Sequence, residues 1–270
     1  MRSACLTALF FLLATSTLAR TETSNTQLPK NTVLYGVGYT NQYDSYLSPA
    51  EYTGVQLDLL YVRNRLLQGG RKSNKTTLPH ITHQSLLDIQ LHTSTPETQF
   101  PRLYGADIHY DAGWYYNWWH VGTPRLSMKL GGQVGGTLGG IYANRASNNP
   151  ANAHAALRTS LSAGAQYALP LRRTQLTFRY QADLPLIGAA FSPDYGQSYY
   201  ELSQHGYSRN ICFTSLAHAF SIRQLALMDI CLRRCTLTFG YKADIRQAKL
   251  NYLRQHQYAH SFMIGWKKRF

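Results

Sequence analysis

The sequence predicts an all-β protein, namely an antiparallel up-and-down β-barrel of about ten strands that crosses a membrane. Apolar and polar side chains alternate with a period of two over most of residues 32–270, as in strands with two different faces. After the first 19 residues no run of about 18 apolar residues follows, so helices cannot provide the crossing. Only helices and closed barrels satisfy every backbone group in hydrocarbon, and 20 Tyr, 20 Gly and 15% charged residues suit a barrel with aromatic girdles.

The chain begins with the features of a secretory signal peptide, which we expect to occupy residues 1–19. Arg2 supplies the positive charge, residues 6–14 the apolar stretch and Ala19 the small residue before the cleavage site. Residues 20–31 are interpreted as a flexible periplasmic leader, and residues 32–270 as a single barrel domain. Export combined with a barrel predicts the bacterial outer membrane as the location.

Five strands are expected in the first half of the chain, at residues 33–40, 52–61, 87–92, 103–116 and 126–142. Each keeps apolar or aromatic residues on one face and polar residues or glycine on the other. The pattern is longest in the fourth strand, where Ile108 and Trp114 alternate with Asp107 and His109. Loops rich in Pro, Ser, Asn or Gly separate the strands, and one of them, at residues 69–75, is a basic turn.

The second half repeats the pattern at residues 157–167, 176–183, 237–246 and 260–270, with a large loop at 185–210. Residues 211–232 are the least regular part, and we interpret them as one bulged strand, which gives ten strands. A hairpin that turns near Arg223 and Gln224 is the alternative and gives twelve strands. Both counts are even, so either one returns the two termini to the same side. A short polar turn is expected at residues 253–257.

The formal net charge of +14 raises the question of nucleic acid as a partner. The bases lie at strand ends and tight turns, such as Arg172, Arg173, Arg233 and Arg234, and no recognition motif accompanies them. We therefore expect outer-membrane lipid headgroups and lipopolysaccharide as their partners, with the outer-membrane assembly machinery during insertion, and no nucleic acid.

Cysteine and histidine spacing predicts neither a metal nor a cofactor. Cys212, Cys231 and Cys235 remain after the signal peptide, and an odd number leaves at least one thiol unpaired. Cys231 and Cys235 flank a tight turn, and whether they are bridged stays open. The histidine pairs 80/83 and 256/260 have no third ligand near them in sequence.

One group of residues has the composition of a hydrolytic site. Asp107, His109 and Asp111 share the polar face of one strand, and His92 lies on the polar face of the strand before it. Neighbouring strands are about 5 Å apart, so a histidine held between carboxylates would be a candidate general base. The favoured interpretation is a structural network that fills a narrow lumen, and its members would be Asp88, Lys129, Arg158, Arg179 and Asp183.

Tyrosines in two loops are the candidate binding residues. Tyrosine combines apolar area with a hydroxyl group at low entropic cost, which suits a surface that binds a glycan or a protein. The alternative is a loop packed over the barrel mouth. The candidates are Tyr43, Tyr46, Tyr195, Tyr199 and Tyr200.

Several stretches resemble an uncharacterised family of exported proteins, the domain of unknown function 3316. They are residues 46–54, with Leu47-Ser48-Pro49, residues 148–153, and above all 185–188 with 191–201. The resemblance implies no activity and no catalytic residues, because none is established for that family. The final strand, which ends at Phe270, also resembles the C-terminal signature of outer-membrane barrels, although Lys268 stands where an apolar residue is usual.

Together these observations favour a non-enzymatic outer-membrane barrel with a filled polar lumen that serves as a structural protein or binds an unknown ligand through its loops. One alternative is a hydrolase of lipid or lipopolysaccharide that uses His109 as its base. A small-solute pore is the other.

Overall fold

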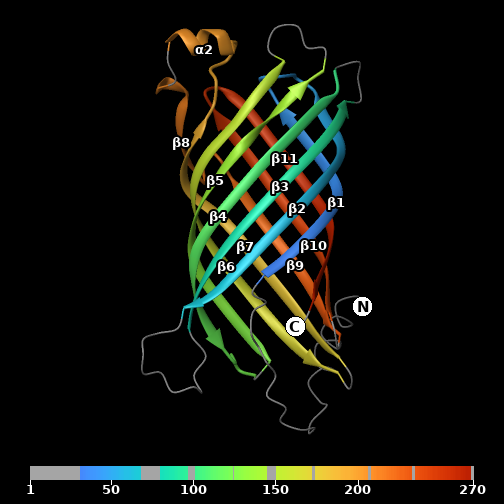
Figure 1. The fold of residues 1–270 in the computed structure, drawn as a ribbon. Coiled ribbons are helices and arrows are strands. Elements are labelled where there is room, and N and C mark those ends of the chain that lie inside the picture. Colours follow the sequence, from blue (N-terminus) through green and yellow to red (C-terminus); the bar gives the residue numbers. More distant parts are fainter. Residues whose placement is uncertain are drawn as a thin grey trace, which may run out of the picture.

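In the computed structural model of the protein, eleven strands within the described residues form one antiparallel sheet that closes into a barrel (Figure 1). The structure describes residues 31–67, 80–96, 101–123, 125–144, 150–171, 174–205, 208–232 and 235–268. The predicted signal peptide, the predicted leader up to residue 30, the basic turn at 69–75 and Phe270 lie outside these residues.

The strands follow the chain around the barrel and are tilted, and all except the five-residue β8 are long (Figure 1). Their bounds are β1 Asn31–Asp44, β2 Glu51–Leu67, β3 Ile81–Pro96, β4 Leu103–Trp119, β5 Leu126–Ala143, β6 Ala151–Pro170, β7 Gln175–Phe191, β8 Ile211–Ser215, β9 Ser221–Cys231, β10 Cys235–Leu250 and β11 Leu253–Lys268. A helix, α2 (Tyr199–His205), and a short 3-10 turn, Ser208–Asn210, lie between β7 and β8.

The barrel closes between its first and last strands. Val37 on β1 is the register partner of Phe262 on β11, as expected for a sheet that leaves no edge between its ends. Strands β8 and β9 both pair with β7. Strand β8 pairs with the last five residues of β7, and β9 pairs with the first nine residues of β7. They therefore occupy one place in the wall, and the barrel has ten positions, which confirms the predicted count.

The twelve-strand alternative is wrong. Arg223 does not lie in a turn but inside β9, opposite Asp183 of β7, to which its guanidinium donates hydrogen bonds. The irregular pattern of this region has a different cause. Between the pairs Ser215–Ile187 and Arg223–Asp183, residues 216–222 stand opposite only residues 184–186 of β7, so the chain bulges there. The backbone amides of Gln247 and Lys249 on β10 still donate to the carbonyls of Phe220 and His218.

The wall has the two faces that the alternation predicts. Ile108 is 49% and Trp114 59% exposed on the outer face, whereas Asp107 and His109 on either side of Ile108 are buried inside. Outward apolar residues recur all around the barrel, and they include Tyr35, Val37, Leu57, Leu91, Tyr110, Val134, Leu138, Leu157, Phe178, Phe239, Phe262 and Trp266. Within the described residues no helix has the length and apolar character needed to cross a membrane.

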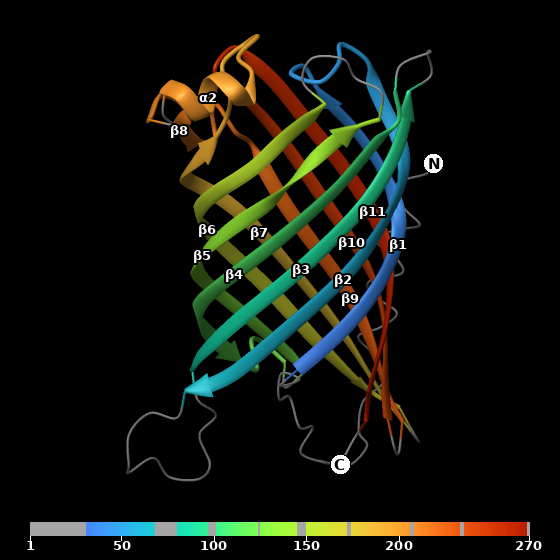
Figure 2. The same ribbon diagram turned by 45° about the horizontal axis from the view of Figure 1, so that its top comes forward.

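The two ends of the barrel differ, and we name them for what they carry. The loop end holds residues 45–50, helix α2 with its flanking loop, and the turn Asn251–Tyr252, while β1 begins and β11 ends at the opposite, terminal end (Figures 1 and 2). The polar turn expected at residues 253–257 is wrong in position, because the reversal uses Asn251 and Tyr252 and β11 begins at Leu253. Cys212, Cys231 and Cys235 are all free thiols.

The interior is less uniformly polar than the sequence predicts. One buried apolar cluster consists of Leu34, Leu60, Val62, Leu86, Leu225, Leu227 and Met263. A second, at the loop end, consists of Tyr52, Leu103, Ile141 and Ala143, with Leu47 and Ala50 packed against it. Charged side chains fill the space between these clusters, so the lumen is packed in layers rather than filled by polar groups alone.

Candidate functional site

The centre of the lumen is a network of ion pairs between strands on opposite sides of the barrel. Arg223 on β9 reaches Asp111 on β4 at 2.8 Å and Asp183 on β7 at 2.7 Å. The ammonium group of Lys242 on β10 lies 2.6 Å from Asp58 on β2 and 2.9 Å from Asp88 on β3, and all three side chains are buried. Because these cations each bind two carboxylates, they tie four or more strands together.

The five residues predicted for the lumen network all point inward. Asp88 pairs with Lys242, and Asp183 pairs with Arg223. Arg158 lies 3.2 Å from Asp111, and Arg179 lies 2.7 Å from Asp229. Lys129 instead donates to the amide oxygens of Gln181 and Gln84 and stands over the ring of Tyr115. Four of the five predicted residues therefore form ion pairs, whereas Lys129 is bound by amide oxygens and an aromatic ring.

The candidate general base, His109, is not held between carboxylates. Its ring is 1% exposed, and its Nδ1 lies 2.8 Å from the hydroxyl of Thr137, which also accepts a hydrogen bond from Arg158. Asp111, two residues away, binds Arg158 and Arg223. The histidine that pairs with a carboxylate is His154 on β6, whose Nδ1 lies 3.0 Å from Asp107 Oδ1.

His92, the other candidate, is buried beside the backbone of β4. Neither ring nitrogen has a hydrogen-bond partner within the described residues. Its register partner is Gly105, where a Cβ atom would collide with the imidazole, so glycine is required for the ring to lie flat on the neighbouring strand. In the described residues no group of three or more His, Cys, Asp and Glu side chains is placed to hold a metal ion.

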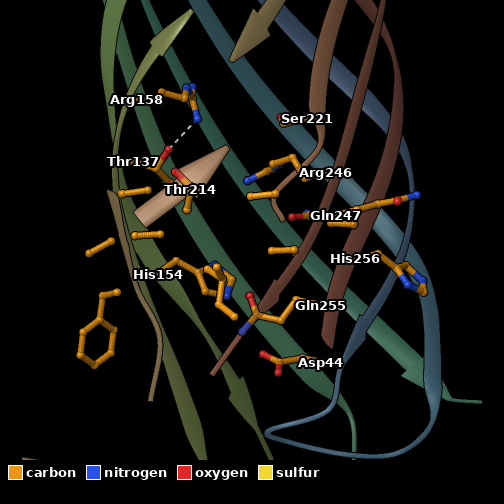
Figure 3. Close-up of a pocket in the computed structure, with 18 of the residues that line it drawn as sticks. Asp44, Thr137, His154, Arg158, Thr214, Ser221, Arg246, Gln247, Gln255 and His256 are labelled. Carbon is orange, nitrogen blue, oxygen red and sulfur yellow. Dashed lines mark hydrogen bonds between the residues drawn. The ribbon is translucent and has the colours of Figure 1, made fainter. Parts of the chain in front are cut away.

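A cavity of about 190 Å³ lies inside the barrel towards the loop end. Figure 3 shows His154 and Arg158 on one side of it, Arg246 and Gln255 on the other, and Asp44 nearest the loop end. Small side chains leave this space open, among them Ala156, Ala190 and Ala248. At this cavity the charged network borders open space, through Arg158 and Arg246.

The predicted tyrosines divide into two groups. Tyr46 and Tyr199 hold the loop of α2 to the rim, since the Tyr46 hydroxyl donates to the Gln197 carbonyl at 2.7 Å and the Tyr199 hydroxyl accepts from the Ala153 amide at 2.6 Å. Tyr43 stacks on His256 of the neighbouring strand. In contrast, Tyr195 and Tyr200 are 78% and 74% exposed.

Sequence reasoning missed four features of this site. The alternation of polar residues could have shown that His154, Arg223 and Lys242 point into the lumen. It could not have shown their ion-pair partners, because these lie on strands far away in sequence. The fourth feature is Tyr252, which the sequence pattern left just outside the turn expected at residues 253–257. In the structure it lies in the turn, is 91% exposed and has a positive φ of 63°.

Comparison with known proteins places the chain in a family. A family model described as "Protein of unknown function (DUF3316)" matches residues 4–270. This chain belongs to the DUF3316 family. The match confirms the resemblance found in the sequence, and this membership brings no known activity with it. No curated protein matches the chain.

Solved structures with detectable similarity to this DUF3316 chain include three autotransporter barrels. The transport unit of AIDA-I from Escherichia coli is 10% identical, with 98% of this chain and 97% of that chain covered and a TM-score of 0.49. The β domain of the Bordetella autotransporter BrkA is 11% identical, with 90% and 100% covered and a TM-score of 0.39. The translocator domain of NalP from Neisseria meningitidis is 11% identical, with 91% and 90% covered and a TM-score of 0.32.

Proposed function

We propose that this DUF3316 protein is a bacterial outer-membrane barrel that is closed to solutes and binds a surface glycan through tyrosines at its loop end. The continuous apolar outer face supports insertion into a bilayer, because such a face would be costly in water. The two buried apolar clusters and the ion-pair network between them support a closed lumen. We propose that the loop end faces outwards and the termini face the periplasm.

The observation that carries the binding proposal is the anchoring of the tyrosine-bearing loop. Leu202 of α2 is fully buried, and Asn210 donates to Ser192 and to Gln197 within the loop. Asn251 donates to the Ser192 carbonyl at 2.9 Å, which joins the loop to the β10–β11 turn. A loop fixed by so many contacts presents its exposed side chains with little loss of entropy on binding.

Tyr252 adds an independent observation, because its conformation is unfavourable. Asn251 and Tyr252 have φ values of 47° and 63°, the conformation of a two-residue hairpin turn that strongly favours glycine at the second position. A non-glycine residue in this region costs about 1–2 kcal/mol. Since its side chain is almost fully exposed, packing does not offset that cost, and a role in binding would explain its presence.

The surroundings of these tyrosines favour a glycan over a protein partner. Tyr195, Tyr200 and Tyr252 are highly exposed, and polar residues such as Gln197 and Asn251 lie close to them in the chain. Single aromatic faces with hydrogen-bonding neighbours suit the mixed polar and apolar surface of a sugar.

The test is a glycan array probed with the purified full-length barrel in a neutral detergent, after cell fractionation has located the protein. We expect recovery with outer membranes and binding to a subset of glycans. Replacing Tyr195, Tyr200 and Tyr252 together by Ala should reduce that binding at least tenfold, whereas Tyr180→Ala on the outer wall should leave it unchanged. Tyr252→Gly alone should weaken binding while making the protein more stable. Failure of the wild type to bind any glycan, or equal binding by the triple variant, would exclude this function.

A further inference from the structure

The cavity inside the barrel is lined by one buried carboxylate that forms no ion pair within the described residues. Eight aspartates are buried in the described interior, and in seven of them a carboxylate oxygen lies within 4.0 Å of a Lys, Arg or His nitrogen. Asp44, which lines the cavity, has no such partner within the described residues. Within the described residues its carboxylate oxygens accept hydrogen bonds from the Asn152 side-chain amide at 2.6 Å and the Tyr46 backbone amide at 3.0 Å, and from no other group.

Three more cavity-lining residues have polar atoms without a partner. Within the described residues, Gln42 Oε1, Gln257 Nε2 and Arg246 Nε make no hydrogen bond, although Gln42 is 2% and Gln257 7% exposed. Buried polar groups are paired in nine of ten cases or more. Unpaired atoms also occur elsewhere in the lumen, for example at His92, so it is the grouping of these atoms around open space that points to a ligand. These three residues, with Asp44, form what we call the cavity row.

The cavity row has a direction. Gln257 on β11 is the register partner of both Arg246 on β10 and Gln42 on β1, and Asp44 follows Gln42 on the same face. The row therefore runs from a guanidinium donor to a carboxylate acceptor. Arg158, whose contacts with Asp111 are 3.2 and 3.3 Å long, lies across the cavity from Arg246 (Figure 3).

From this geometry we propose that the cavity binds a small zwitterion with a primary ammonium at one end, an anionic group at the other and an apolar spacer between them. The ammonium pairs with Asp44 and donates to Gln42 Oε1, and the anion accepts from Arg246, Gln257 and Arg158. Ile141, Ala190 and Ala248 contact the spacer. This site is separate from the tyrosines proposed to bind glycan, so either proposal stands without the other.

The charge balance favours a zwitterion over a simple anion or cation. Eight interior aspartates outnumber the six interior Lys and Arg residues (Lys129, Arg158, Arg179, Arg223, Lys242 and Arg246), so a lone anion would add to an excess of negative charge. A lone ammonium would leave the Arg246 and Gln257 donors without acceptors. An engineered cavity of about 150 Å³ holds benzene, so a cavity of this size holds on the order of ten heavy atoms.

Adjacent strands are about 5 Å apart, and the row from Arg246 to Gln42 crosses two such steps. A spacer of four to six carbons would bring the two charged ends to the two ends of the row. Aminocarboxylates of this length are free solutes with the required chemistry. O-phosphoethanolamine, a lipid headgroup, carries the same two charges on a two-carbon spacer and therefore tests a shorter separation.

The experiment is isothermal titration of the full-length barrel in neutral detergent with a matched set of water-soluble probes. The set is 6-aminohexanoate, 8-aminooctanoate, O-phosphoethanolamine, hexanoate, hexylamine and hexanol. We expect at least one zwitterion to bind one per chain and at least tenfold more tightly than the last three probes. Tighter binding of phosphoethanolamine would indicate that the natural ligand is a lipid headgroup. Tighter binding of an aminocarboxylate would indicate that it is a free solute.

Variants test the assignment of the two ends. Asp44→Asn and Ala248→Phe should each weaken binding of the zwitterion at least tenfold, the first by removing the carboxylate charge and the second by filling the cavity. Asp194→Asn in the nearby loop and Ala226→Phe on the outer wall are the matched controls and should bind like the wild type. The proposal is wrong if no zwitterion binds, if hexylamine or hexanoate binds as tightly, or if Asp44→Asn and Ala248→Phe leave binding unchanged.

Discussion

At the scale of single residues, the interior depends on cations that each satisfy two buried carboxylates. Lys242 is the clearest case, because it is fully buried and bound by both Asp58 and Asp88. Its strand could be recognised from sequence, since Lys242, Asp244 and Arg246 alternate with Tyr241, Ala243 and Ile245. Its partners could not, because they lie 184 and 154 residues away and depend on how the barrel closes.

Replacing Lys242 by Met should therefore be strongly destabilising. The substitution leaves two carboxylates buried without a cation, and breaking a buried pair by removing one member costs about 3–5 kcal/mol. Urea unfolding of the barrel reconstituted in phospholipid vesicles would measure this loss. Lys249→Met, at an exposed position of the same strand, is the control and should change stability by less than about 0.5 kcal/mol. Equal stability of the two variants would show that the ion pairs do not hold the interior together.

At the scale of elements, the sequence predicted the strands better than the loops. Alternation placed the strands because every second residue meets a different environment, whereas the loop of α2 is held by single hydrogen bonds that have no periodicity. Its hydroxyl contacts are sensitive to alkaline pH. Burial, followed by the nearby Tyr199 and acidic groups, raises the pKa of Tyr46 to about 12, and burial also raises the pKa of Tyr199.

The anchoring of this loop should weaken as the pH rises from about 10 towards about 12. An unfolded tyrosine titrates near pH ~10, so the stability contributed by the neutral Tyr46 hydroxyl is complete below that pH and is lost above it. Hydrogen exchange of the amides in residues 192–205 would follow the change. The double variant Tyr46→Phe, Tyr199→Phe should show fast exchange already at pH 7, with the strand amides unaffected. Slow exchange in that variant would mean that the buried Leu202 alone secures the loop.

At the scale of the whole molecule, the apolar outer face and the packed inner face of the wall together determine the structure of the barrel. The outer face was predicted along most strands, as for Ile108 and Trp114, because the surroundings on that side are uniform and any apolar residue suits them. Residues 211–232 were the exception. The inner face is packed like a protein core, and its two apolar clusters use residues such as Leu34 and Leu60 whose neighbours are set by register and closure. Sequence alone therefore predicts the wall more fully than what the wall encloses.

A charged residue on the outer face distinguishes a membrane barrel from one that stands in water. Val134 lies in the middle of β5 and is 59% exposed, and Leu171 lies beyond the end of β6 and is 49% exposed. In a bilayer, Val134→Arg should cost about 2–4 kcal/mol and Leu171→Arg about 0–1 kcal/mol, because the cost falls from the hydrocarbon centre to the interface. Urea unfolding in phospholipid vesicles would measure both. In water neither arginine would be buried, so two equally mild substitutions would mean that the apolar face meets something other than lipid.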